Sequence, residues 1–445
     1  MSEQFIRTTP PEKDSKYWNK HVETMPIQEL RKIQEKKMRE MLVYVYENSA
    51  FYKRKFRRLG LKPDDIKTLE DFFKKVPFSD KDEVRIEAEK SKDPFAGTLC
   101  LPKEKIHILN PTTGTTGTPT IIASTYGDVT GYGSEQNART LWMMGVRPGH
   151  LFHYCAPRWH NMVQFHEYAL QKIGVTTIKT DIVPAEADRI ISLAKLLKPD
   201  GAHLGIGLAL TLEEKLKGEK LPYKYISVAG DVLVPSLRRK MSDVFGGEVY
   251  NYTGLADIHW YACECDFHNG IHTFEDLYIS EVIDPETGEQ VEDGERGELV
   301  LTNLWAKGQP HLRWRTGDIV TINREPCDCG RTHPRIYYLG RKAFAVKVFE
   351  KEIFPSEVED AIREENETET AIFQFIRYAS KMDTLKIRVA PIPERVKDKN
   401  ELKNRLEKKI SSLLKTPVEV EIVKPEEIEW ATWKPIRILD LTKKT

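Results

Sequence analysis

A segment rich in threonine and glycine, residues 110–120, gives the clearest sign of chemistry in the chain. It reads Asn-Pro-Thr-Thr-Gly-Thr-Thr-Gly-Thr-Pro-Thr. Glycine lets a backbone turn tightly and approach a ligand closely, and the threonines add hydroxyl donors beside the backbone amides. Such a loop is suited to hold the oxygens of a polyphosphate. The P-loop spacing, with four residues between two glycines and then Lys, is absent. The alternative is a surface turn.

Two segments with cysteine pairs contain the residue types of a second chemical site. Cys265 is followed by His268, and Cys327 precedes Cys329, so together they offer three sulfurs and one imidazole. That set suffices for a tetrahedral zinc ion, and four protein ligands leave no open position for a substrate. We therefore predict a structural zinc site on Cys265, His268, Cys327 and Cys329.

Other ligands and another explanation stay open for these cysteines. Cys263 and His272 lie in the same stretch and compete as zinc ligands. The alternative is that the cysteines are free and buried. In a chain with no secretion signal, paired cysteines are metal ligands more readily than disulfides.

The charge and hydropathy patterns exclude several classes of function. The 68 Lys and Arg residues balance 68 Asp and Glu residues, so no global basic field exists to hold nucleic acid. No apolar run approaches the roughly 20 residues of a membrane helix. The N-terminus, MSEQFIRTTPPEKDSKYW, has no apolar signal segment. These features predict a cytoplasmic, multi-domain enzyme that binds neither nucleic acid nor membrane.

Short apolar runs alternate with helical patterns through the middle of the chain, as in α/β proteins. Apolar residues recur along 27–48 at the spacing of an amphipathic helix. Helices are expected at 27–48, 68–73, 186–197 and 235–245, and strands at 106–109, 151–154 and 249–252.

The composition changes near Gly340-Arg341, and about 100 residues beyond that point suffice for a separate compact unit. The pattern predicts helices from 355 and across 402–413, and strands at 371–376, 385–389 and 418–422. We therefore divide the chain into a large N-terminal domain, 1–340, and a small α+β domain, 341–445.

An ordered series of motifs along nearly the whole chain resembles the adenylate-forming superfamily, the acyl-CoA synthetases and their relatives. The closest resemblance is to the phenylacetate-CoA ligase family. The series consists of 17–52, the loop at 112–120, Ala229-Gly230-Asp231, Thr253-Gly-Leu-Ala-Asp257, Trp314-Arg-Thr-Gly-Asp318, Cys327-Asp-Cys-Gly-Arg-Thr-His-Pro-Arg335, Gly340-Arg341 and Lys434-Pro-Ile-Arg-Ile-Leu-Asp440. So many motifs in the family's order are not expected by chance.

The resemblance implies an α/β fold, with a large N-terminal adenylate-forming (AMP-binding) domain of mixed sheets and a small α+β C-terminal lid domain. It also implies a two-step reaction. A carboxylate attacks the α-phosphorus of ATP and pyrophosphate leaves, and a thiol, usually that of CoA, then captures the acyl-adenylate. The most specific expectation is an aryl- or arylacetate-CoA ligase that acts on a small carboxylic acid with ATP, Mg²⁺ and CoA, and that holds a structural zinc ion.

The resemblance further assigns roles to individual residues. The loop is expected to hold the β- and γ-phosphates, Asp257 a magnesium ion, and Asp318 both ribose hydroxyls. Lys434 is expected to reach from the lid to the α-phosphate and the attacking carboxylate, where it offsets developing charge. The implied nucleotide-binding residues are Thr112, Thr113, Gly114, Thr115, Thr116, Gly117, Gly230, Asp231, Tyr252, Thr253, Gly254, Asp318 and Arg335.

Several positions depart from the family's pattern. Ala256 replaces a hydroxyl residue, and Asp257 is one methylene shorter than the usual Glu. Residues 342–344, Lys-Ala-Phe, stand where an Asp-rich hinge is expected, and Glu350 stands where a glycine lets the pantetheine arm pass. These changes agree with adenylation and put the thioester step in question.

Two other functions therefore stay open. One is an adenylating enzyme with a non-CoA acceptor, either an amide ligase or an AMP-transferring enzyme similar to the coenzyme F390 synthetases. The other is a degenerate nucleotide-binding protein. The acid cannot be named from the sequence. The aromatic and His-rich residues 152–166 and the segment 203–210 are either walls of its pocket or ordinary core. Relatives are often dimers, so a homodimer also stays open.

Overall fold

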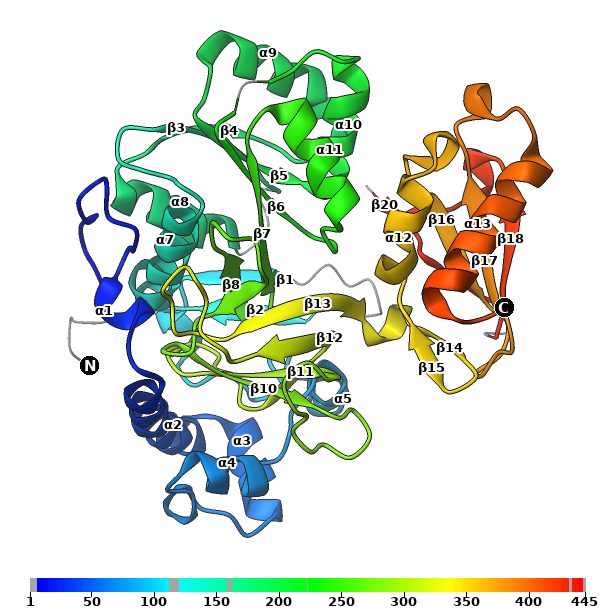
Figure 1. Ribbon diagram of the computed structural model, residues 1–445. Coiled ribbons are helices and arrows are strands. Elements are labelled where there is room, and N and C mark those ends of the chain that lie inside the picture. Colours follow the sequence, from blue (N-terminus) through cyan, green and yellow to red (C-terminus); the bar gives the residue numbers. More distant parts are fainter. Residues whose placement is uncertain (1–5, 112–119, 158–161, 222, 432–433, 443–445) are drawn as a thin grey trace.

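The computed structural model describes residues 6–111, 120–157, 162–221, 223–431 and 434–442 of the 445-residue chain. They form a large α/β domain with a smaller α+β domain beside it at the C-terminal end (Figure 1). The fold class expected from the sequence is confirmed. Within these ranges, no helix combines the length and the apolar character that crossing a membrane requires.

Helices cover the sheets of both domains. The α-helices are α1 (Lys20–Glu23), α2 (Ile27–Asn48), α3 (Ala50–Arg58), α4 (Leu69–Lys75), α5 (Lys81–Ser91), α6 (Tyr126–Asp128), α7 (Ser134–Met143), α8 (Met162–Ile173), α9 (Ala187–Leu197), α10 (Ile206–Leu216), α11 (Pro235–Phe245), α12 (Ser356–Arg363) and α13 (Lys399–Leu414). Short 3₁₀ or π turns are η2 (Pro63–Asp65), η3 (Lys103–Lys105), η4 (Val129–Gly133), η5 (Pro184–Glu186), η6 (Lys342–Phe344), η7 (Asn366–Thr368), η8 (Pro393–Arg395) and η9 (Pro425–Glu427).

The strands belong to one large sheet and several small ones. They are β1 (Ile108–Pro111), β2 (Ile121–Ser124), β3 (Leu151–Cys155), β4 (Thr176–Thr180), β5 (Gly201–Gly205), β6 (Tyr225–Ala229), β7 (Glu248–Leu255), β8 (His259–Glu264), β9 (Ile271–Thr273), β10 (Tyr278–Ile283), β11 (Arg296–Asn303), β12 (Trp314–Asn323), β13 (Arg335–Arg341), β14 (Val346–Val348), β15 (Lys351–Ile353), β16 (Ile372–Arg377), β17 (Leu385–Ala390), β18 (Val418–Ile422), β19 (Trp430–Ala431), β20 (Lys434–Pro435) and β21 (Ile438–Asp440).

The large sheet of the described residues has two halves that meet at β7. Its eleven strands run in the order β10-β11-β12-β13-β9-β8-β7-β6-β5-β3-β4. From β7 to β4 neighbouring strands are parallel, and from β7 to β10 they are antiparallel. β7 is therefore the strand that connects a parallel α/β unit to an antiparallel one.

Local sequence explains the main helices. Leu30, Met38 and Val45 are buried along one face of α2, as the helical spacing predicted. Thr68 accepts a hydrogen bond from the backbone N–H of Asp71 and thereby caps α4. The strand expected at 106–109 begins two residues later, at β1, because η3 and the residue after it take up a turn.

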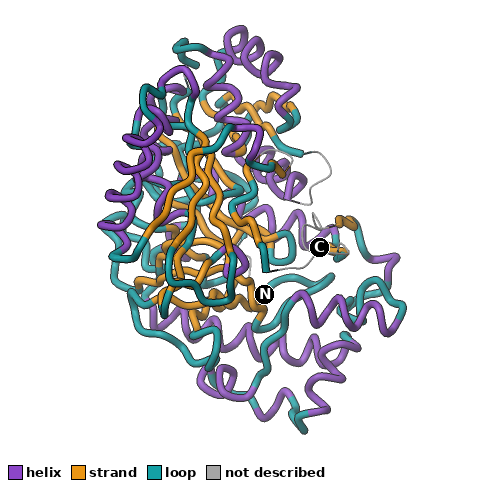
Figure 2. The backbone as a smooth tube through the Cα atoms, turned by 90° about the vertical axis from the view of Figure 1, so that its right-hand side faces the viewer, coloured by secondary structure: helices purple, strands orange, loops and turns teal. Residues whose placement is uncertain are grey.

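The C-terminal domain contains a four-stranded sheet in the order β18-β17-β16-β21. Leu402, Leu406 and Ile410 recur at helical spacing along α13 and are fully buried in this domain's own core. The domain contacts the large domain through α12, where the backbone N–H of Ser236 donates to the Asp360 carboxylate at 2.9 Å. Arg296 and Glu357 add an ion pair at 2.7 Å. Figure 2 views the molecule from the side on which Figure 1 places the C-terminal domain, with helices purple and strands orange.

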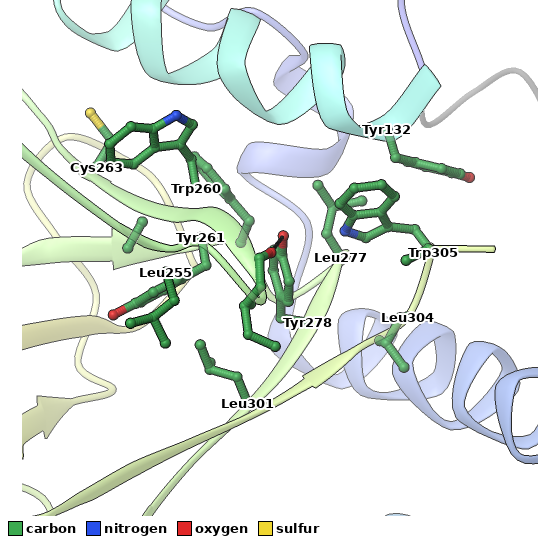
Figure 3. Packing of buried hydrophobic residues seen from close by; sticks show 14 of the residues in the cluster. Tyr132, Leu255, Trp260, Tyr261, Cys263, Leu277, Tyr278, Leu301, Leu304 and Trp305 are labelled. Carbon is green, nitrogen blue, oxygen red and sulfur yellow. Dashed lines mark hydrogen bonds between the residues drawn. The ribbon is translucent and has the colours of Figure 1, made fainter. Parts of the chain in front are cut away.

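The core of the large domain is rich in aromatic rings. Tyr261, Tyr278 and Trp305 pack in one buried cluster around the antiparallel half of the sheet (Figure 3). Trp260, on β8, packs in the same cluster and faces the region of the predicted site segments. The antiparallel half therefore forms a rigid wall beside the parallel half.

Candidate active site

The parallel half of the large sheet provides the place where open α/β folds bind ligands, the crevice outside the carboxyl ends of the strands. β6 ends at Ala229, and β7 lies next to it in parallel with Val228 opposite Asn251. The predicted segments 229–231 and 253–257 thus follow two neighbouring strands. The structure brings them to one edge of the sheet although they are distant in sequence.

The turn after β6 has a backbone conformation that suits glycine. Gly230 has φ +103°, in the region that other residues adopt only with strain. The Asp231 carboxylate accepts the backbone N–H of Val232 at 2.9 Å, which fixes the following turn. Both predicted residues therefore shape the crevice edge through the backbone.

The end of β7 is closely packed against β8. A Cβ atom on Gly254 would lie 2.6 Å from Cε3 of Trp260 and 2.7 Å from the carbonyl oxygen of His259. Tyr252, two residues earlier, is buried, and its hydroxyl lies 2.9 Å from Nδ1 of His203. Burial raises the pKa of Tyr252 well above its usual value. Thr253, opposite Ala262 in the ladder, is held in this same strand end.

Asp257, the predicted magnesium ligand, lies just beyond β7 and faces the N-terminal end of α5. Its carboxylate is 3.8 Å from the Lys81 ammonium. Burial lowers the pKa of Lys81, and the charge of Asp257 acts in the opposite direction. The structure thus adds a lysine to this site that the sequence did not identify, because no local pattern links α5 to β7.

Asp318, the predicted ribose ligand, is buried on β12 and already has two partners. The Tyr338 hydroxyl donates to its Oδ1 at 2.8 Å, and the Arg341 guanidinium lies 3.1 Å from the same oxygen. Burial raises the pKa of Asp318, and the positive charge of Arg341 opposes that rise. The carboxylate is therefore fixed in place by two residues of β13.

Two predicted sites lie partly or wholly outside what the structure describes. Thr112, Thr113, Gly114, Thr115, Thr116 and Gly117 are outside the described residues. β1 and β2, on either side of that segment, pair antiparallel with Pro111 opposite Ile121. Lys434 lies on β20, which pairs with β19 in the C-terminal domain. Figure 1 shows β20 on the side of this domain that faces the large domain.

Arg335, predicted to bind nucleotide, lies elsewhere. It begins β13, whereas Arg341 ends β13 opposite Asp318. Six residues of extended strand separate the two by roughly 20 Å. The Arg335 guanidinium donates to the carbonyl oxygens of Asn269 and Glu325, at 3.3 and 3.0 Å. In the structure Arg335 holds the loops around the cysteines, and its nucleotide-binding role stays a prediction.

The cysteine pairs do converge on one point. Cys265, His272, Cys327 and Cys329 are all buried, and one ligand atom from each lies within 4.8 Å of the others. The Cys265 and Cys327 sulfurs are 3.9 Å apart, and the Cys329 sulfur is 3.4 Å from Nε2 of His272. Neighbouring sulfurs of a tetrahedral zinc site with bonds of about 2.3 Å lie about 3.8 Å apart. The donor set and its spacing therefore fit zinc.

The fourth side chain of this group is His272, where the sequence prediction had His268. The Nδ1 atom of His272 donates to the carbonyl oxygen of His333 at 2.9 Å, which leaves Nε2 directed at the sulfurs. His268 instead lies between acidic groups, 3.3 Å from Glu264 and 3.2 Å from Glu248. The reason is the path of the chain. His268 sits in the turn after β8 with φ +50°, while β9 carries His272 back along β8 and β13. Cys263, the other competing ligand, lies outside this group.

Comparison with known proteins agrees with this geometry. Residues 351–442 match the model of the AMP-binding enzyme C-terminal domain. The chain is 30% identical over 349 residues to the phenylacetate-coenzyme A ligase of Thermus thermophilus, covering 76% of each chain. The chain belongs to the phenylacetate-CoA ligase family. The motif series found in the sequence is therefore that of this family.

Solved structures of a related ligase resemble the whole chain. The structure of 2-hydroxyisobutyryl-CoA ligase in its postadenylation state, with an acyl-adenylate bound, gives a TM-score of 0.87 at 25% identity, covering 97% of this chain and 93% of that one. The same ligase in its thioesterification state gives a TM-score of 0.71 at 26% identity with the same coverage. The arrangement of the two domains in this family member is thus nearer the postadenylation arrangement.

Proposed function

We propose that this protein activates a small carboxylic acid with ATP, forms an acyl-adenylate and transfers the acyl group to CoA. Membership of the phenylacetate-CoA ligase family carries this proposal. The buried Asp318, fixed by Tyr338 and Arg341 beside the crevice, is consistent with it. The most specific form is an aryl- or arylacetate-CoA ligase that releases AMP and pyrophosphate.

The chain's own residues divide the work of the first step. Asp318 would accept hydrogen bonds from the ribose hydroxyls, and the segment 112–117 would bind the β- and γ-phosphates. Lys434 would offset the charge that develops on the α-phosphate and the attacking carboxylate. Phosphoryl-type transfer depends mainly on such positioning and charge neutralisation, so the lysine is the residue with the largest expected effect.

Asp257 is the proposed ligand of Mg²⁺, a hard cation that prefers oxygen donors. When bound, the ion would neutralise the charge of the polyphosphate. Lys81, 3.8 Å from the Asp257 carboxylate, places a second positive charge at the same point. The shorter side chain of Asp257 is therefore accompanied by a cation that the protein supplies itself.

Zinc is proposed to bind Cys265, His272, Cys327 and Cys329. Four protein ligands leave no position for a substrate, so the role would be structural. The site would join the turn after β8 to the turn before β13. Because β9, which carries His272, lies between β8 and β13 in the antiparallel half, the ion would hold these three strands together.

Glu350 favours one second candidate, an adenylating enzyme with a non-CoA acceptor. It lies at the tip of the β14–β15 hairpin, where it forms ion pairs with Lys381 and, at 3.4 Å, with Lys347. If this carboxylate obstructs or repels CoA, a Glu350→Gly variant should accelerate CoA-dependent AMP release. Absence of CoA-dependent AMP release in both proteins would favour another acceptor.

The cellular setting is also a proposal. We place the protein in the cytoplasm, with ATP, CoA and a small acid as its partners. A homodimer stays a prediction, which light scattering on the purified chain tests.

Acid-dependent exchange of pyrophosphate into ATP tests the first step. A Lys434→Ala variant should lose this exchange by several orders of magnitude, because the cation at the reacting phosphate is gone. Lys408→Ala, an exposed lysine on α13 of the same domain, is the matched control and should retain the exchange. Equal exchange by both variants would contradict the assignment of Lys434.

A further inference from the structure

Three histidines are buried along the parallel strands, His166 and His203 on one face of the sheet and His153 on the other. His153 lies on β3, His203 on β5 and His166 on α8, and their exposed fractions are 0%, 6% and 0%. His153 and His203 have partners, because Nε2 of His153 lies 3.1 Å from the Thr180 hydroxyl and Nδ1 of His203 lies 2.9 Å from the Tyr252 hydroxyl. These two histidines therefore belong to the hydrogen-bonded framework of the domain.

His166 differs from the other two. Among the described residues, neither of its ring nitrogens has a hydrogen-bond partner. Burial lowers the pKa of His166 well below its usual value. A neutral imidazole has one N–H donor and one acceptor nitrogen. Leaving a buried polar group without partners destabilises the folded protein, so Phe or Leu would be more stable here if packing were the only role.

Aromatic rings surround His166 on several sides. Tyr154 stacks on it, with ring centroids 5.3 Å apart and an angle of 7° between the ring planes. The centroids of Tyr252, Trp260 and His203 lie at 5.7, 5.8 and 6.1 Å. The indole N–H of Trp260 also has no partner among the described residues. The surroundings are thus flat and apolar, with two unpaired polar groups.

The position of this group connects it to the proposed reaction. Tyr252 contacts both His166 and His203, and it immediately precedes Thr253 and Gly254 at the crevice. An acid whose carboxylate attacks ATP in the crevice would direct its other end down toward Tyr252. The two rings that contact Tyr252 and carry polar atoms without partners among the described residues are His166 and Trp260.

We propose that the acid is an aromatic acid whose ring carries a hydroxyl or amino group distal to the carboxylate, and that His166 recognises this group. The inference rests on the proposed acid activation and specifies its substrate class. The flat aromatic surroundings match an aromatic ring, and the substituent would pair with the imidazole. Because His166 has no exposed surface in this arrangement, a covering ring such as that of Trp260 has to move when the acid binds.

Exchange assays on the full chain with matched acids test the proposal. The probes are 4-hydroxyphenylacetate, 4-aminophenylacetate, phenylacetate and 4-methylphenylacetate, the last of which matches the hydroxyl in size but forms no hydrogen bond. We expect kcat/KM for the hydroxy or amino acid to exceed that for the methyl acid at least tenfold, mainly through KM. A preference for the methyl or unsubstituted acid would overturn the proposal.

Variants of His166, which has no hydrogen-bond partner among the residues that the structure describes, and of His153, which has one, distinguish recognition of the acid from packing of the core. His166→Phe should lower kcat/KM for the hydroxy or amino acid at least tenfold and leave the methyl acid unchanged or improved. His166→Asn, which keeps a donor and an acceptor, should restore part of the preference. His153→Gln is the matched control and should keep the preference of the natural protein.

Two outcomes would count against the proposal in different ways. If His166→Phe lowers the rate with every acid equally, the imidazole is structural and the substrate class is wrong. If no carboxylic acid supports exchange by the unaltered protein, the proposed acid activation itself fails and this inference fails with it.

Discussion

The large domain contains two groups of buried histidines that differ in what surrounds them. In the cysteine cluster, His272 and three sulfurs converge so that their ligand atoms lie within 4.8 Å of one another. In the aromatic cluster, His166 stands among rings whose centroids are 5.3 Å or more away. Soft donors that meet at one point favour a metal ion, whereas rings around an isolated imidazole favour a planar organic ligand.

The cysteine cluster also joins the N-terminal segment to the rest of the domain. The Tyr17 hydroxyl donates to the carbonyl oxygen of Cys329 at 2.9 Å. Arg331 pairs with Glu23 at 2.8 Å, and both side chains are almost completely buried. Loss of the cluster would therefore leave a buried ion pair without support. The aromatic cluster also joins distant strands, but through ring packing without converging soft donors, so the two groups should respond very differently to substitution.

Removal of the metal should produce the largest effect of the comparison. A Cys327→Ser/Cys329→Ser double variant should fall from about one zinc per chain to almost none. Apparent binding free energies of structural zinc are on the order of 10 kcal/mol, so we expect a melting temperature lower by tens of degrees or an insoluble product. Elemental analysis and thermal melts provide the measurement.

Cys263→Ser is the control for that experiment. Cys263 is as buried as Cys265 and only two residues away, yet it lies outside the converging group. It should keep its zinc and most of its stability. Undiminished zinc in the double variant, or equal loss in the control, would remove the assignment.

Whether His272 or His268 binds the zinc ion gives a test with a smaller expected effect. His272→Ala should reduce zinc affinity by one or more orders of magnitude, because a ligand held by the His333 carbonyl is lost. His268→Ala should retain the metal, since its ring faces Glu248 and Glu264. Competition with a chelator of known affinity measures both. If His268→Ala releases zinc more readily, the ligand set derived from the structure is wrong.

These cases show which part of the site follows from the sequence. The motif order and the helix and strand periods predicted the fold class, and short spacings such as Cys327-x-Cys329 predicted half of the metal cluster. The fourth ligand did not follow, because His268 and His272 are both near Cys265 and only the return of β9 along β8 decides between them. That return is a long-range pairing with no local signal.

The positions of Arg335 and Lys81 in the fold could not be read from the sequence, for the same physical reason. Arg335 belongs to a family motif, but an extended strand carries it roughly 20 Å from Asp318. Lys81 reaches Asp257 only through the packing of α5 on the large sheet. The segment 152–166 was recognised as a candidate pocket wall from its composition. Which imidazole lacks partners depends on the neighbouring strands.

The smallest effect concerns the response to acid of His153, which lies on the opposite face of the sheet from the aromatic cluster. Burial lowers the pKa of His153 from 6.5 to about 4. As the pH falls below 6.5, the unfolded chain gains a proton at this residue that the folded protein does not gain until about pH 4. The free energy of unfolding therefore falls as the pH is lowered through this window. The difference of 6.5 minus 4 corresponds to about 3 kcal/mol.

A His153→Gln variant should lose that dependence, because the glutamine amide does not titrate and still offers a hydrogen bond to Thr180. Urea unfolding at pH 7 and pH 4.5 measures it. On going from pH 7 to pH 4.5, the free energy of unfolding should fall by about 2 kcal/mol less in the variant than in the natural protein. His107→Gln, at an exposed histidine, controls for the substitution itself. An unchanged pH dependence of stability in His153→Gln would mean that water reaches this histidine and that burial does not lower its pKa.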